Sequence, residues 1–218
     1  MGSITISRQL GSHGARVARG VARKLGWPLA DKATINTVIR EYGLTQLDDI
    51  YGPKPPRFWD LFENNKVWTI EWMNKTIQAI AAQEDAVILG RGGFAVLGGY
   101  ADVLNVFIKA SDDVRAHRIG LRDDISQADA AEKVAADDKA RAKFTRLFYS
   151  LDWADESNFD LVLDTGEVTD EVAMDRIIEA YRAKISAAPA GPSIAELVPD
   201  ALLAESVRGR FGKTSQTH

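Results

Sequence analysis

The sequence predicts an α/β protein built on a parallel, doubly wound sheet with helices on both faces. Two observations support this fold class. Short apolar segments recur along the 218 residues, and polar or glycine residues follow each of them. Longer segments with helical periodicity lie between the apolar ones. Alternation of strands with helices is typical of parallel sheets covered on both faces.

The predicted strands are short, and the predicted helices follow them in turn. We predict strands over Ser3–Ser7, Pro28–Ala30, Ala86–Leu89, Val103–Ile108 and Phe159–Leu163. We predict helices over about 13–25, 33–42, 58–83, 112–125, 127–149 and 170–186. Ser111, Ser126 and Thr169 stand directly before three of these helices, in the N-cap position that hydroxyl side chains favour.

Two segments interrupt this alternation. Residues 44–57 contain one glycine and three prolines and are predicted to be a loop. Residues 187–218 begin with Ala-Ala-Pro-Ala-Gly-Pro and are predicted to hold a linker, one short helix over about Ser193–Val207 and a frayed terminus. We therefore divide the chain into a domain over residues 1–186, with a helical lid over about 115–149, and a C-terminal segment over 187–218.

The C-terminal segment carries more apolar residues than a solvated tail needs. They recur through its predicted helix at Ile194, Leu197, Val198, Leu202 and Val207. A continuous apolar face is normally buried. We expect it to dock on its own domain or on a second subunit, so a homodimer is an open alternative.

Composition excludes several classes of function. A formal net charge of −4 argues against duplex nucleic acid as the main ligand. The absence of cysteine excludes disulfides, thiolate metal sites and a cysteine nucleophile, and the three histidines are far apart in the sequence. No apolar run approaches the roughly 20 residues of a membrane span, and the first residues lack a leader pattern. We expect a cytoplasmic protein that binds small molecules, without duplex nucleic acid or membrane partners.

Residues 4–26 read as a buried strand, a glycine turn and an amphipathic helix. This order predicts a phosphate-binding loop, because backbone N–H groups at a helix N-terminus converge on one point and the helix dipole favours an anion there. Gly11 and Gly14 are predicted to let the backbone approach a phosphate closely.

The loop departs from the usual G-x-x-x-x-G-K-[ST] pattern. Aligned on the strand, Arg8 and His13 stand at the two glycine positions, Gly14 at the lysine and Ala15 at the Ser/Thr. The segment is therefore either a variant nucleotide site that uses other cations or a helix start that only resembles one.

Polar residues follow the other predicted strands, and ligands of open α/β sheets bind beyond these carboxyl ends. Arg91 lies between Gly90 and Gly92, where a planar guanidinium could bind a phosphate in bidentate fashion; the alternative is an ordinary turn with a solvated arginine. Asp31 ends the second strand. It could hold a metal-bound water, orient an acceptor hydroxyl or take its proton, and it could also cap the following helix.

Arginines recur on the two helices of the predicted lid. Arg115, Arg118 and Arg122 share one face of the first, and Arg141, Lys143 and Arg146 follow on the second. Phosphoryl transfer needs positive charge close to the transferring group, which such a lid could supply. The alternative for several of them is a solvated helix face.

The motifs together resemble those of the cytidylate kinase-like proteins, a branch of the P-loop nucleoside monophosphate kinases. The resemblance covers about residues 3–185. It rests on Ile-Thr-Ile-Ser-Arg-Gln-x-Gly-Ser-x-Gly, Leu-Gly-Trp-Pro-Leu-Ala-Asp-Lys, Gly-Arg-Gly, and Asp-Trp-Ala-Asp followed by Phe-Asp-Leu-Val-Leu-Asp-Thr.

The resemblance implies a three-layer P-loop NTPase fold, ATP or another nucleoside triphosphate as phosphoryl donor, and Mg²⁺. It implies a donor site at Arg8, Gln9, Gly11, Ser12, His13, Gly14, Ala15 and Arg16, with Ser12 at the metal and Arg16 in place of the missing lysine. It places Asp31 and Arg91 at the phosphate acceptor, and Arg115, Arg118 and Arg141 in the lid. Gly92 stands where the family's Gly-Arg-Asp motif has its aspartate, which puts cytosine recognition in doubt.

These residues lead to a kinase as the expected function. The chain would move the terminal phosphoryl group of the triphosphate to a nucleoside monophosphate of the cytidylate type or to another small hydroxyl metabolite. The alternative, supported by the missing lysine and Ser/Thr, is a nucleotide-binding regulatory protein without turnover. A third reading is an interaction module with an inactive site.

Overall fold

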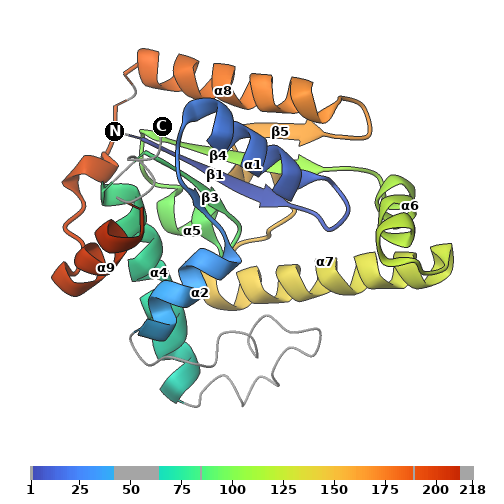
Figure 1. The fold of residues 1–218 in the computed structure, drawn as a ribbon, viewed down its shortest axis with the longest axis horizontal. Helices are drawn as coiled ribbons and strands as arrows, with labels where there is room; N and C mark the ends of the chain where they lie inside the picture. The colour runs from blue at the N-terminus through green and yellow to red at the C-terminus, as the bar shows by residue number, and fades with distance from the viewer. Residues whose placement is uncertain (1, 42–63, 84, 189, 212–218) are drawn as a thin grey trace.

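A computed structural model describes residues 2–41, 64–83, 85–188 and 190–211 (Figure 1). Its centre is one five-stranded sheet in the order β2-β3-β1-β4-β5. All neighbouring strands are parallel. The strands are β1 (Ser3–Arg8), β2 (Leu29–Ala30), β3 (Ala86–Leu89), β4 (Val103–Lys109) and β5 (Leu161–Asp164).

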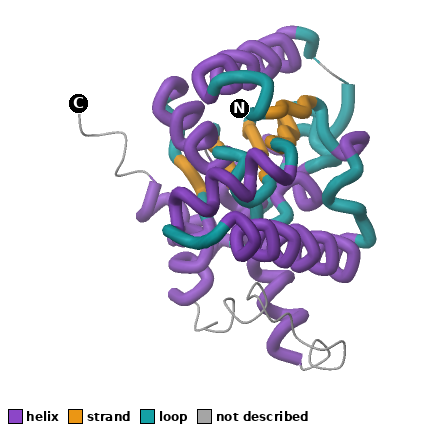
Figure 2. Tube along the Cα trace, turned by 90° about the vertical axis from the view of Figure 1, so that its right-hand side faces the viewer, coloured by secondary structure: helices purple, strands orange, loops and turns teal. Residues whose placement is uncertain are grey.

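Helices cover both faces of this sheet, so the predicted three-layer, doubly wound architecture is confirmed. Helices α1 (Gly14–Leu25) and α8 (Asp170–Ser186) lie side by side on one face (Figure 1). The other side carries α2 (Lys32–Glu41), α4 (Asn64–Gln83), α5 (Gly93–Leu97) and α7 (Gln127–Tyr149). Turned by 90°, the strands lie between the two sets of helices (Figure 2).

The alternation of side chains along β1 shows how the layers are joined. Ile4 and Ile6 are fully buried in the apolar cluster that includes Val17 and Val21 of α1. Thr5, between them, is buried and its hydroxyl donates to Asn105 Oδ1 of β4 over 2.6 Å. The buried hydroxyl of Thr5 thus finds its hydrogen-bond partner inside the sheet.

The predicted N-caps are observed. Ser111, Ser126 and Thr169 each accept a backbone N–H, at the starts of α6 (Asp112–Asp123), α7 and α8. The helix predicted over 58–83 is confirmed for Asn64–Gln83. Residues 58–63 and the loop predicted over 44–57 lie outside the described part of the chain.

Two elements differ from the prediction. Helix α5 was not predicted, because its five residues are too few for a periodic pattern to show. The single helix predicted over Ser193–Val207 is divided into a 3₁₀ turn, η3 (Ile194–Glu196), and α9 (Ala201–Phe211). Pro199 lacks an N–H, and the carboxylate of Asp200 accepts from Leu202 N and Leu203 N, so a new helix begins there.

The C-terminal segment packs on its own domain. Ile194, Leu203 and Val207 are almost fully buried in the cluster that holds Ile35 of α2 and Ile77 of α4. Of the apolar residues predicted to dock, Val198 and Leu202 remain exposed. No described helix is long and apolar enough to cross a membrane.

Candidate functional site

The chain between β1 and α1 forms a tight loop that ends at the N-terminus of a helix. Two residues hold left-handed backbone conformations, Gly11 with a φ of +82° and His13 with a φ of +58°. Histidine is among the non-glycine residues that adopt this region most often. The first turn of α1 contains no acidic residue, so its N–H groups remain suited to an anion.

The two loop glycines are required by neighbours within the protein. A Cβ on Gly11 would lie 2.7 Å from the backbone oxygen of Arg115, and a Cβ on Gly14 would collide with the side chain of Arg8. The sequence reading assigned both glycines to the approach of a phosphate. The structure gives a different physical reason, which is the close packing of the loop against α6 and against its own first residue.

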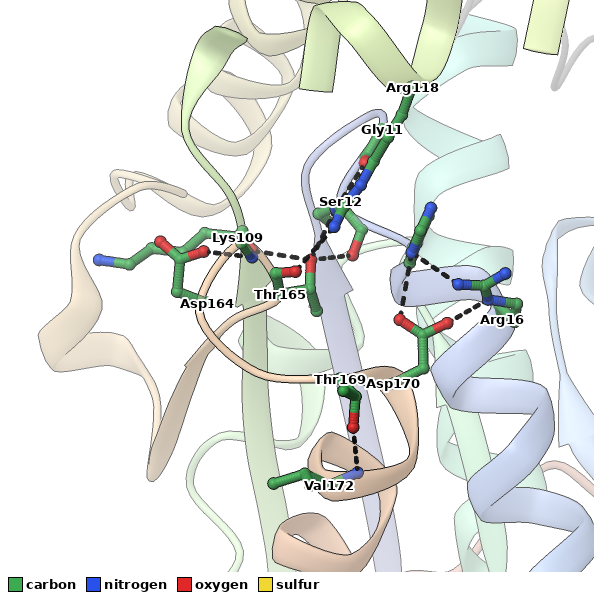
Figure 3. Close-up of polar contacts among 12 residues, drawn as sticks. Gly11, Ser12, Arg16, Lys109, Arg118, Asp164, Thr165, Thr169, Asp170 and Val172 are labelled. Carbon is green, nitrogen blue, oxygen red and sulfur yellow. Dashed lines mark hydrogen bonds and ion pairs between the residues drawn. The ribbon is translucent and has the colours of Figure 1, made fainter. Parts of the chain in front are cut away.

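Hydrogen bonds fix the loop from behind (Figure 3). Ser12 is fully buried, and its hydroxyl donates to the Gln9 carbonyl over 2.9 Å. Thr165, directly after β5, donates to the Ser12 carbonyl over 2.8 Å. Arg118 donates to the Gly11 carbonyl over 3.2 Å and to Thr165 Oγ1 over 2.9 Å. These contacts to the carbonyl groups of the loop hold it in one shape, and the Ser12 N–H itself donates to the Gln9 carbonyl over 3.3 Å.

Gln9 adds a further contact at the start of the loop. Its side-chain oxygen accepts the backbone N–H of Ala110, which lies after β4. The neighbouring ends of β1 and β4 are thereby joined through a side chain, in the register that pairs Arg8 with Ile108.

Arg115 is the most deeply buried cation of the described chain, with 1% of its surface exposed. Its guanidinium donates to both carboxylate oxygens of Asp138, to Asp112 and to the Ala110 carbonyl. Burial alone would lower the pKa of Arg115, but the hydrogen bonds to Asp138 and Asp112 raise it, so the side chain stays charged. Its contacts join α6 to α7.

Arg16 lies on the side of α1 that faces α8. Its guanidinium pairs with Asp170 and contacts His13 Nδ1 over 2.8 Å, and His13 Nδ1 lies 3.1 Å from Asp170 (Figure 3). The Arg16 side chain is 61% exposed. The first turn of α8 therefore neutralises the cation that the sequence reading placed on the transferring phosphoryl group.

The Arg8 side chain extends from the end of β1 past the start of α1 toward the end of β3. Its Cγ would lie 2.9 Å from a Cβ on Gly14, at the start of α1, and its Cζ would lie 3.0 Å from a Cβ on Gly90, at the end of β3. The side chain is half-buried along this path. The guanidinium thus reaches from the phosphate loop to the neighbouring strand end.

The end of β3 carries the second part of the site. Arg91 is only 6% exposed, and its Nη2 donates to Asn36 Oδ1 of α2 over 2.5 Å. A solvated arginine in an ordinary turn, the alternative reading, is therefore wrong. Asp31 accepts from the backbone N–H and the hydroxyl of Thr34, so it does cap α2.

The carboxyl end of α7 packs against the residues that follow β3. Tyr149 packs on Gly92, where a Cβ would lie 2.6 Å from its ring, and its hydroxyl donates to Asn74 Oδ1 of α4 over 2.8 Å. Gly92 has a φ of +75°, a left-handed conformation that glycine adopts without steric penalty. The residue that departs from the family motif is thus the one that admits Tyr149.

Helices α6 and α7 form the hairpin predicted to be a lid. Their small apolar cluster, which includes Ile119 and Val134, also packs against Leu10 of the phosphate loop. Arg141 pairs with Asp137 one turn away and lies 6.0 Å from the ring of Trp153. Catalytic roles for the lid arginines Arg115, Arg118 and Arg141 stay predictions, and all three make structural contacts.

The structure brings most of the predicted residues to the carboxyl edge of the sheet, and it adds several that the sequence reading passed over. Thr165 was noted only as a polar strand end. The residues missed were Asn36, Asn74, Tyr149 and Asp170. Asn36 carried a usable signal, since it is a polar residue within the apolar stretch of α2 between Ile35 and Val38. Contacts of Asp170 with α1 had no local signal, because 157 positions separate it from His13.

The fold and the sequence both match known proteins. A crystal structure of a protein from Eubacterium ventriosum has a TM-score of 0.68 with 21% identity, and covers 84% of this chain and 99% of that one. Shikimate kinase from Bacteroides thetaiotaomicron has a TM-score of 0.50 with 14% identity, over 85% and 98% of the two chains. These likenesses confirm the P-loop kinase fold.

Sequence relatives give the family. The cytidylate kinase of Pyrobaculum aerophilum is 31% identical over 170 residues, which are 76% of this chain and 85% of that protein. That of Pyrobaculum calidifontis is 29% identical over 190 residues, 83% and 95% of the two. A uronate isomerase of Corynebacterium glutamicum is 33% identical over 104 residues, but these cover 48% of this chain and only 20% of that protein.

The family model described as the cytidylate kinase-like family matches residues 3–167, which are most of the chain and hold every residue of the site described above except Asp170. The loop, the buried arginine after β3 and the helical hairpin all lie within this range. The chain belongs to the cytidylate kinase-like family and is related to small-molecule kinases that use a nucleoside triphosphate.

Proposed function

We propose that the protein transfers the terminal phosphoryl group of ATP, or of another nucleoside triphosphate, to a small acceptor that carries an anionic group. A nucleoside monophosphate of the cytidylate type is the first candidate, and another small hydroxyl metabolite with a phosphate or carboxylate is the second. Family membership supports the kinase class, and the site supports an anionic acceptor.

The observation that carries the proposal is the burial of Arg91. A guanidinium with 6% exposure loses most of its hydration, so its partners have to replace that hydration, and one of them is the Asn36 side-chain oxygen. Phosphate and carboxylate groups match the planar guanidinium and bind it through bidentate hydrogen bonds. Arg91 is the second residue after β3, and β3 is the neighbour of β1, so an acceptor there would lie next to the phosphate loop.

The residues around the loop fit a metal–nucleotide complex. Backbone N–H groups at the start of α1, with no carboxylate in its first turn, suit the phosphates. Magnesium is usually held by one or two protein ligands together with substrate phosphates. Ser12, the predicted protein ligand, would have to turn its hydroxyl away from the Gln9 carbonyl. When bound, the complex supplies the phosphoryl group and partly neutralises its charge.

The chain's own residues would then position the reactants. The loop would hold the donor phosphates, Arg91 with Asn36 would hold the anionic group of the acceptor, and Asp31 would orient the attacking hydroxyl or accept its proton. Asp31 is only partly exposed and directly follows β2, which pairs with β3 and is separated from β1 by that strand. Most of the rate acceleration in such a site comes from positioning and charge stabilisation.

A labelled-phosphate screen tests this proposal. The full chain is incubated with ATP labelled in the terminal phosphate, Mg²⁺ and a panel of acceptors: nucleoside monophosphates, sugar phosphates, hydroxy acids and neutral sugars as the control group. We expect transfer to at least one anionic acceptor and a loss of at least tenfold in kcat/KM for Arg91→Met. Transfer only to neutral sugars would contradict the role given to Arg91.

A second candidate function is nucleotide binding without turnover. The observation that favours it is the pair Gly14 and Ala15, which stand where P-loop enzymes carry a lysine and a hydroxyl. Tight ATP binding with no transfer to any acceptor in the same screen would favour this regulatory role over the kinase.

A further inference from the structure

The cation that replaces the P-loop lysine has to lie on the inner side of the loop, where the transferring phosphoryl group would be. P-loop enzymes place this lysine at the first position of the helix, from which it reaches the terminal phosphates of the donor. In this chain Gly14 occupies that position and is buried. The chemistry of phosphoryl transfer still needs positive charge there.

We propose that Arg8, at the opposite end of the loop, supplies that charge, so that the lysine and the first glycine of the usual motif have exchanged roles. This inference rests on the proposed function. The side chain of Arg8 lies over Gly14 so closely that any Cβ on Gly14 would collide with it. Glycine at the lysine position and arginine at the first glycine position are therefore one structural feature.

The path of the Arg8 side chain supports this assignment. It starts at the end of β1, passes over the first residue of α1 and ends at Gly90, directly before Arg91. Its guanidinium lies between the phosphate loop and the arginine proposed to hold the acceptor. A cation at that place would contact the negatively charged phosphoryl group as it moves from the donor to the acceptor.

The other arginines near the loop lie in different places. Arg16 pairs with Asp170 on the α8 side, and its charge is partly neutralised there. Arg118 donates to the Gly11 and Thr165 carbonyls, behind the loop. Arg115 is bound by two carboxylates. Compared with these arginines, Arg8 is the one whose side chain lies over the first residue of α1 and reaches the end of β3.

The backbone allows the exchange to be reversed. Gly14 is absent from the glycines with positive φ, and it is the first residue of α1, so a lysine fits its backbone once Arg8 is removed. The double variant Arg8→Gly with Gly14→Lys therefore restores the usual arrangement. The single variant Gly14→Lys does not, because its Cβ meets the Arg8 side chain.

The experiment measures binding of Mg·ATP and Mg·ADP by calorimetry and the slow release of phosphate from Mg·ATP, neither of which needs an identified acceptor. Arg8→Gln keeps the methylene groups over Gly14 and removes the charge. We expect it to lower ATP turnover at least 100-fold and to weaken ATP more than ADP. Arg19→Ala, which removes an exposed arginine of α1, is the control and should match the wild type.

The double variant decides the outcome. We expect the ATP turnover of the double variant to be at least tenfold higher than that of Arg8→Gly. Its melting temperature should be near that of the wild type. Turnover of Arg8→Gln within threefold of the wild type would overturn the inference, as would a folded double variant no better than Arg8→Gly. Both results would leave the proposed kinase intact, whereas a wild-type protein that binds neither nucleotide would remove both proposals.

Discussion

At the scale of single residues, the arginines of this chain divide by what their guanidinium groups contact. Arg115 and Arg118 bind carboxylates and backbone carbonyls and hold the loop and hairpin in shape. Arg91 lies buried at the acceptor corner beside the amide of Asn36. The sequence shows that arginines are dense near the strand ends, but it does not show which of them face carbonyl oxygens.

The Arg115–Asp138 pair gives a stability prediction at this scale. Asp138→Ala leaves a buried guanidinium without its bidentate partner, and breaking a buried pair from one side costs about 3 kcal/mol or more. Asp112→Ala removes the other carboxylate from the same guanidinium, but that side chain is 88% exposed and should contribute less than about 1 kcal/mol. Denaturant unfolding of the two variants measures both values. Equal losses would show that the Asp138 contact is not the stabilising one.

At the scale of elements, the α6–α7 hairpin is coupled to the phosphate loop from two directions. Leu10 of the loop packs into the apolar cluster between the two helices. The backbone oxygen of Arg115, in α6, lies where a side chain on Gly11 would be. A ligand that orders the loop should therefore also order the hairpin, which is what a lid requires.

Amide exchange tests this coupling. We expect peptides from residues 112–149 to exchange more slowly when Mg·ATP and an acceptor or acceptor analogue are present. Peptides from the C-terminal half of α8, which packs on the far side of the sheet from α7, serve as the internal control. Hairpin exchange that is identical with and without ligands would count against a lid that closes.

At the scale of the whole molecule, the predictable features were those with a local cause. Strand β3 has the predicted bounds, and hydroxyl N-caps marked α6, α7 and α8 correctly. The packing of the C-terminal segment was predictable from its apolar residues, but its partner was not. Ile194 N donates to Asp102 Oδ1 over 2.9 Å, a contact across 92 positions.

In the candidate site, too, the features with a local cause could be predicted and the contacts between distant residues could not. The phosphate loop and the buried strand ends were visible as glycine and arginine motifs, because those residue types are needed locally. The family resemblance placed Arg16 as the substitute for the lysine, and that role stays a prediction. The structure adds that α8 supplies Asp170 to this arginine, and a contact between two helices that are distant in the sequence has no signature within either one.

The docking of α9 predicts that substitutions at two adjacent leucines will have very different effects on stability. Leu203 is fully buried among side chains of α2 and α4, and Leu203→Ala should destabilise the protein by about 3 kcal/mol. Leu202 is 64% exposed, and Leu202→Ala should change stability by less than about 0.5 kcal/mol. Thermal or denaturant unfolding measures both. Removal of residues 188–218 should likewise lower the melting temperature, and an unchanged value would show that the segment does not stabilise the domain.

The central claim is that the loop between β1 and α1 binds the phosphates of a nucleoside triphosphate. Calorimetric titration of Mg·ATP into the wild type and into Gly14→Val tests it most directly, with melting temperatures as the check on folding. We expect saturable binding by the wild type. We expect at least 50-fold weaker binding by a folded Gly14→Val protein, because the new side chain collides with Arg8 and displaces it from the loop. Equal affinity for ATP in the two proteins, or no binding by the wild type, would contradict the claim.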